Sequence, residues 1–170
     1  MNFDFSDREK DFLSQLGTAL EDFARDRDLE AGDLETLGGN LGEALGLLAS
    51  LGYLKVGLSQ PDPPLAGTLA LMAAMERLAA VSPSLFLAVE MSTRLFGRTL
   101  ALGAATPEGE ALGKQLAAGA IVGAVALSEA AMNVENDPLA TTGTLEGDTV
   151  YVSGAKSYVV NGPLADWLAV

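Results

Sequence analysis

The sequence contains neither cysteine nor histidine. Without cysteine there is no disulfide framework and no thiolate nucleophile. Without histidine, ordinary zinc sites, 2-His-1-carboxylate iron sites and a Ser-His-Asp triad are also excluded. Any chemistry must therefore use carboxylates, hydroxyls, backbone amides or a bound cofactor, and these residue types alone identify no catalytic residue and no metal ligand.

Basic residues are scarce, with 10 Lys and Arg against 23 Asp and Glu, for a net charge of -13. Binding nucleic acid or anionic lipid requires clustered cations, so neither is an expected partner. The longest apolar stretches, 41–58 and 116–127, are interrupted by charges or too short for a bilayer core, which needs about 20 apolar residues. The charged N-terminus has no apolar leader, which predicts a cytoplasmic protein.

Hydrophobic residues make up 49% of the 170 residues, enough for one domain or a domain and the start of another. Ser6 and Glu9 have capping-box spacing, and a repeating apolar face follows, which predicts a helix over 7–26. Residues 24–39 are predicted to be a polar linker that ends in paired glycines, and Asn40 then predicts the start of a second helix, which closes at Gly52. Three prolines within 61–64 predict a loop, after which Thr68 opens a third helix.

Two more helices are expected before residue 120. Residues 85–103 are apolar all round, which predicts a helix at the centre of a bundle. Thr106 followed by Pro107 is typical of a capped helix start, and that helix runs through Leu116. Residues 1–120 are therefore predicted to be a helical domain.

Strand signals dominate from Ile121 onward. Residues 121–127 are branched and apolar, and the next segment alternates around a turn at Gly147 and Asp148, which predicts a hairpin. Residues 156–170 predict two more short strands separated by a turn at 161–163. The whole is an α+β fold, an N-terminal helical bundle followed by the start of a small antiparallel β-domain at 121–170. Its last, apolar strand predicts a partner or further chain that completes the sheet.

Several strings together resemble the N-terminal half of an acyl-CoA dehydrogenase. They are FSDREKDF, LGYLKVGL, MERLAAVSPS, LAAGAIVGAVALSE and GDTVYVSGAKSYVVNGPLADWLAV. The interval from Ser128 to Gly154 fits without a gap the family's spacing between a Thr-Glu-Pro-Gly-Ala-Gly-Ser-Asp run and a Gly-x-Lys-x-Trp-Ile-Thr-Asn run. The resemblance implies an acyl-CoA dehydrogenase-like fold, and it covers about half of a typical family member.

The resemblance also implies a site. It places FAD against Leu127, Ser128, Tyr158, Val159 and Val160. It places the acyl-CoA substrate against Glu129 and Val134.

The implied reaction is α,β-dehydrogenation of an acyl-CoA thioester, with FAD as hydride acceptor. The family's catalytic base lies on a second helical domain, so no residue here matches it. Ala130, Ala131 and Asn133 stand where the family has a proline and glycines, and Val160 stands where a threonine would donate to the flavin.

Alternatives remain open at this point. The chain is the N-terminal half or a subunit of a flavin-dependent acyl-CoA dehydrogenase, in a homo- or hetero-oligomer, or a catalytically inactive structural or regulatory subunit of a heteromer. A weaker third possibility is a module that binds acyl thioesters without redox chemistry. From the residues alone, Ser128 and Glu129 also fit an exposed strand end, Tyr158 fits sheet packing and Lys156 fits a surface lysine.

Overall fold

The computed structural model, which describes residues 4–56, 68–103, 106–130 and 138–170, has helices first and strands afterwards. The helices are α1 (Asp7–Ala24), α2 (Leu34–Ser50), the 3-10 turn η1 (Tyr53–Lys55), α3 (Thr68–Val81), α4 (Pro83–Glu90), the π-helix η2 (Met91–Phe96), α5 (Gly97–Gly103) and α6 (Pro107–Ala117). The strands are β1 (Gly123–Val125), β2 (Thr142–Glu146), β3 (Thr149–Ser153) and β4 (Trp167–Ala169). This order confirms the predicted α+β class.

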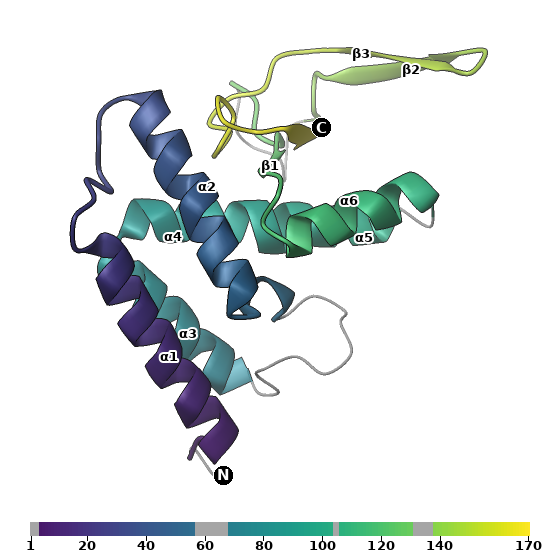
Figure 1. Cartoon of the computed structure of the whole chain (residues 1–170). Coiled ribbons are helices and arrows are strands. Elements are labelled where there is room, and N and C mark those ends of the chain that lie inside the picture. Colours follow the sequence, from purple (N-terminus) through teal and green to yellow (C-terminus); the bar gives the residue numbers. More distant parts are fainter. Residues whose placement is uncertain (1–3, 57–67, 104–105, 131–137) are drawn as a thin grey trace.

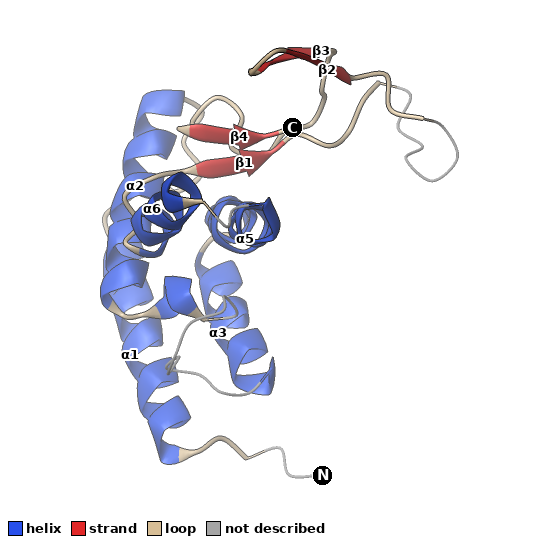
Figure 2. Ribbon diagram, turned by 90° about the vertical axis from the view of Figure 1, so that its right-hand side faces the viewer, coloured by secondary structure: helices blue, strands red, loops and turns tan. Residues whose placement is uncertain are grey.

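Most of the helices pack around a large leucine-rich core, and a smaller buried cluster of Phe96, Leu116 and Ile121 lies between α5, α6 and β1. Helix α1 runs along α3, and α2 crosses the continuous rod of α4, η2 and α5 (Figure 1). Strands β1 and β4 lie over this rod, and the β2–β3 hairpin projects away from the helices in both views (Figure 2). The largest fully buried apolar side chains are Tyr53, Leu13, Leu16, Leu20, Leu45, Leu48, Leu54 and Leu78. Among the described residues, no helix is long and apolar enough to cross a membrane.

Two helix starts form as the sequence predicts. The hydroxyl of Ser6 accepts from the backbone N–H of Glu9, and the Glu9 carboxylate accepts from that of Ser6, which completes a capping box. At α6 the hydroxyl of Thr106 accepts from the backbone N–H of Gly109, and Pro107 lies in the first turn. The apolar face predicted for α1 is buried: Phe12, Leu13, Leu16, Leu20 and Phe23. Local sequence therefore decides both starts.

Helix α2 begins earlier than predicted, at Leu34 and not near Asn40. Its cap is Asp33, whose carboxylate accepts from the backbone N–H of Thr36 at 2.7 Å. Inside the helix, a Cβ on Gly38 would lie 3.2 Å from the Leu164 side chain, so the glycine interpreted as part of a linker allows a close tertiary contact. The helix closes as predicted before Gly52, which lies just beyond the C-cap Leu51 and has φ 79°.

The predicted hairpin forms, with Glu146 and Thr149 paired on either side of the turn and Gly147 at φ 61°. The predicted strand over 156–160 does not form. The second predicted strand does form, as β4 (Trp167–Ala169), but it pairs with β1 in parallel and not in the antiparallel arrangement expected. Because more than forty residues separate β1 from β4, the chain has the length that a parallel crossover requires.

Polar contacts fix the strands on the helical rod. The Ser92 hydroxyl in η2 accepts from the backbone N–H of Gly123 at 2.9 Å. Asn161, buried and with φ 64°, donates its side-chain amide to the carbonyl of Ala88 at 2.8 Å. A Cβ on Gly123 would overlap the Phe96 ring, so β1 lies directly on η2. These contacts determine where the chain after β1 emerges.

Candidate functional site

Two segments that the sequence analysis assigned to the cofactor site, 127–128 and 158–160, come close together just beyond β1. The backbone N–H of Ser157 donates to the carbonyl of Ser128 at 2.8 Å. The ammonium of Lys156 donates to the carbonyl of Leu127 at 3.1 Å. The structure thus brings Leu127 and Ser128 beside the segment that carries Tyr158, although thirty residues separate Ser128 from Tyr158.

Tyr158 presents its ring to solvent. Tyr158 is 85% exposed, and Leu127 is 54% exposed. The interpretation of Tyr158 as ordinary sheet packing is therefore wrong. Its φ of 56° is unusual for a bulky residue, a conformation that costs about 1–3 kcal/mol and persists only where surrounding contacts impose it. An open aromatic face held in a strained backbone is a suitable platform for a flat ligand.

The other predicted flavin-facing residues lie close along the chain. Ser128, Val159 and Val160 are half-buried. The carbonyl of Val159 accepts from the backbone N–H of Gly162 at 3.0 Å, which starts the turn after Tyr158. Neither valine has a hydroxyl, so Ser128 has the one aliphatic hydroxyl among the five residues assigned to FAD. Val134, assigned to the substrate, lies outside the described residues.

The carboxylate of Glu129 is buried and fully engaged. Its Oε2 accepts from the backbone N–H of Ala140 at 2.6 Å. Its Oε1 accepts from the backbone N–H of Thr141 at 2.9 Å and from the ammonium of Lys156 at 2.8 Å. The side chains of Glu129 and Lys156 are each 11% exposed, so the interpretation of an exposed acid and a surface lysine is wrong. The hydrogen bond from Lys156, followed by those from Thr141 and Ala140, lowers the pKa of Glu129 to about 2.

These side chains can bind and orient a ligand, but they offer little for proton transfer. Glu129 remains ionised, and both its oxygens accept from the protein. A carboxylate with so low a pKa is a poor base near neutral pH. Within the described ranges, no group of three or more Asp and Glu side chains could hold a metal ion.

A second polar group, which the sequence analysis missed, lies inside the helical core. The hydroxyl of Tyr53 donates to Glu90 Oε1 at 2.7 Å, and Arg94 Nη1 donates to the same oxygen at 2.9 Å. The guanidinium of Arg94 also lies 4.7 Å from the centre of the Tyr53 ring. Burial raises the pKa of Tyr53, with the charge of Glu90 second, and burial also raises the pKa of Glu90 against the effect of Arg94. The sequence signal that could have revealed this group is the pair of opposite charges at Glu90 and Arg94, four positions apart in a mostly apolar helical stretch.

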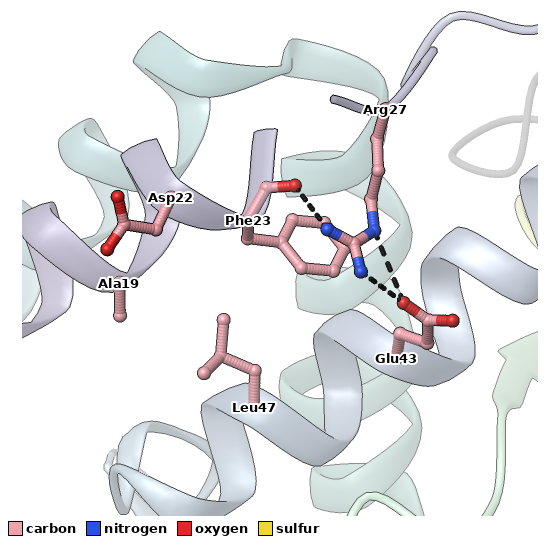
Figure 3. A pocket seen from close by; sticks show the side chains of 6 residues that line it. All are labelled: Ala19, Asp22, Phe23, Arg27, Glu43 and Leu47. Atoms are coloured by element: carbon pink, nitrogen blue, oxygen red, sulfur yellow. Dashed lines mark hydrogen bonds and ion pairs between the residues drawn. The ribbon is translucent and has the colours of Figure 1, made fainter. Parts of the chain in front are cut away.

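A shallow groove lies between α1 and α2, with a volume of about 470 Å³ (Figure 3). Arg27 crosses it, stacks 4.2 Å from the centre of the Phe23 ring and pairs with Glu43 at 2.6 Å. Its remaining lining residues are Ala19, Asp22 and Leu47. Because Arg27 is already paired with an acid, the residues that line the groove present no unpaired cation that would define a ligand.

Only the comparison with solved structures found proteins similar to this chain. No family model and no curated protein matches the sequence. Butyryl-CoA dehydrogenase from Megasphaera elsdenii matches with a TM-score of 0.74 and 23% identity, over 99% of this chain and 45% of that one. A chain from the structure of an electron-transferring flavoprotein of Acidaminococcus fermentans matches with a TM-score of 0.74 and 20% identity, over 99% and 44%.

A glutaryl-CoA dehydrogenase from Mycobacterium smegmatis, solved in complex with FADH2, matches with a TM-score of 0.67 and 19% identity, over 96% of this chain and 42% of that one. The chain thus spans less than half the length of the three solved chains. The chain has an acyl-CoA dehydrogenase-like fold over that length.

Proposed function

We propose that the chain forms the cofactor-facing part of a flavin-dependent oxidoreductase of the acyl-CoA dehydrogenase type. The observation that carries the proposal is the exposed ring of Tyr158, held beside Leu127 and Ser128 by the Ser157–Ser128 hydrogen bond. Tyr158 would stack on FAD, and Ser128 would donate its hydroxyl. When bound, FAD would accept a hydride from an acyl-CoA thioester.

The proposal extends to the remaining residues that the resemblance implies. Val159 and Val160 would line the cofactor from the turn that follows Tyr158, and Val134 would contact the acyl-CoA. None of the site residues described above has a carboxylate free to remove the substrate proton, so a further acyl-CoA dehydrogenase-like polypeptide segment or chain would supply that base. The helical domain would end near residue 120, and the protein would act in the cytoplasm as an oligomer.

Retention of flavin tests the proposal. Purified protein mixed with FAD and desalted will keep the yellow absorbance bands of bound flavin, because Tyr158 provides a stacking face. Tyr158→Ala will lose about 5- to 150-fold in FAD affinity, since aromatic stacking on a ring is worth about 1–3 kcal/mol. Tyr151→Ala, which removes another exposed ring on β3, is the matched control and will retain the bands. A colourless wild-type protein would contradict the flavoprotein proposal.

A second function, a flavin-free subunit of a larger assembly, is favoured by the β2–β3 hairpin. One face of the hairpin is apolar and consists of Gly143, Leu145, Val150 and Val152, of which the last three are exposed large side chains. The other face carries Thr142, Thr144, Glu146, Thr149, Tyr151 and Ser153. A hairpin with one apolar face gains stability by burying it, so this face fits contact with another polypeptide.

Association through that face has a direct test. In sedimentation velocity, the Val150→Lys variant will be distributed toward smaller species than wild type, because a buried charge opposes contact between apolar surfaces. Thr149→Lys, on the opposite face of the same strand, is the matched control and will leave the distribution unchanged. Equal distributions for wild type and Val150→Lys would exclude the hairpin as an association surface.

A further inference from the structure

Glu129 joins three stretches of chain at one point. Its own backbone follows β1, its carboxylate holds the N–H groups of Ala140 and Thr141, and Lys156 approaches from beyond β3. Lys156 also donates to the carbonyl of Leu127. The carboxylate of Glu129 therefore binds the chain again eleven residues later, at Ala140, and its ion pair with Lys156 ties the same point to the Tyr158 segment.

Burial makes this ion pair a rigid connection. Both side chains are 11% exposed, unlike the pair between Lys10 and Asp7, whose side chains are 59% and 98% exposed. A buried pair with its hydrogen bonds satisfied restricts the groups around it more than an exposed pair does. Leu127 lies two residues before Glu129, and Tyr158 lies two residues after Lys156, so displacement of either charge would move the surface formed by these two residues.

We propose that Glu129 and Lys156 are positioning residues, whose ion pair holds Leu127, Ser128 and Tyr158 in the arrangement that receives the ligand. This inference rests on the proposed function and changes the role of Glu129. Its carboxylate acts through Lys156 and the backbone of 140–141, and it does not contact the substrate. The ligand positioned there is a flat, aromatic cofactor, which matches the exposed ring of Tyr158.

Amide hydrogen exchange and FAD titration on the purified chain test the proposal together. In Glu129→Gln and Lys156→Met, the amides of Ala140, Thr141 and Ser157 will exchange about tenfold faster or more, because the contacts that close the segment are lost. FAD will bind about tenfold more weakly in the same variants, because the surface is no longer preorganised. Lys156→Arg, which keeps the charge, will restore part of both effects. Glu43→Gln, which breaks the Arg27 pair on the far groove, is the matched control and will change neither.

The pH dependence of amide exchange provides an independent test of the ion pair. The folded pKa of Glu129 is about 2 against an ordinary 4.5, so its stabilising effect is fully present above pH 4.5 and is lost as the pH falls toward 2. The difference in exchange between wild type and Glu129→Gln will therefore shrink over that interval.

The outcomes separate the two proposals. Unchanged exchange in both Glu129→Gln and Lys156→Met would overturn the positioning role. Faster exchange with unchanged FAD affinity would also overturn it, because the pair would then stabilise the segment without affecting the ligand. A wild-type protein that binds no FAD would overturn the flavin-binding function and the ligand part of this inference, and exchange would still decide whether the pair holds the segment.

Discussion

Replacement of Arg94 by methionine will lower the free energy of unfolding by about 3–5 kcal/mol, as measured by urea denaturation. Arg94 and Glu90 are both buried, with 9% and 5% of their side chains exposed, and Arg94 is the cation bonded to Glu90. Methionine is similar in length but leaves the Glu90 carboxylate without its partner in the core. The cost comes mainly from that uncompensated charge.

The double variant Glu90→Gln with Arg94→Met is the informative comparison. Removing both charges will recover a large part of the lost stability, since a neutral amide can still accept from the Tyr53 hydroxyl. Lys10→Met, which breaks an exposed pair with Asp7, will change stability by less than about 1 kcal/mol. Equal losses in Arg94→Met and in the double variant would show that packing of the arginine stem, and not its charge, matters.

Gly123→Ala will destabilise the protein by roughly 1–3 kcal/mol and, on the function proposed above, will weaken FAD binding at the same time. A Cβ at this position would overlap the Phe96 ring, so β1 must move off η2. That movement also strains the bond between the Gly123 N–H and Ser92 and shifts the chain that leads to Leu127 and Ser128. Urea denaturation and FAD titration of one preparation measure both effects.

Gly46→Ala provides the control for the added methyl group. Gly46 lies inside α2, and a Cβ there would meet nothing within 4 Å. Alanine favours a helix interior over glycine by about 0.5–1 kcal/mol, so this variant will be more stable than wild type. If Gly123→Ala is as stable as wild type, β1 does not depend on close contact with Phe96.

The sequence predicted local elements well because local residues decide them. The Ser6 capping box, the Pro107 helix start and the Gly147 turn each follow from one or two neighbouring residues whose backbone preferences favour a single structure. The buried face of α1 follows from an apolar period that repeats along the helix. The absence of cysteine and histidine likewise excludes whole classes of chemistry from composition alone.

Elements whose form depends on distant residues were predicted less well. The start of α2 was placed too late, because paired glycines are typical of a linker whereas Leu164 packs against Gly38 in the fold. The segment 156–160 has strand-like residues but forms no strand and leads into a turn, with Asn161 bonded to Ala88 in α4. The alternating pattern of a strand carries no information about which other strand will be its partner.

The sequence by itself determined the α+β order, the hairpin, the helix caps and the limited set of reactive groups, because each depends on composition or on residues within a few positions of one another. Only the tertiary structure decided that Glu129 and Lys156 form a buried pair, that the Tyr158 ring is open to solvent and that β4 pairs in parallel with β1. Burial and pairing are properties of atoms brought together from distant parts of the chain, so no local pattern specifies them.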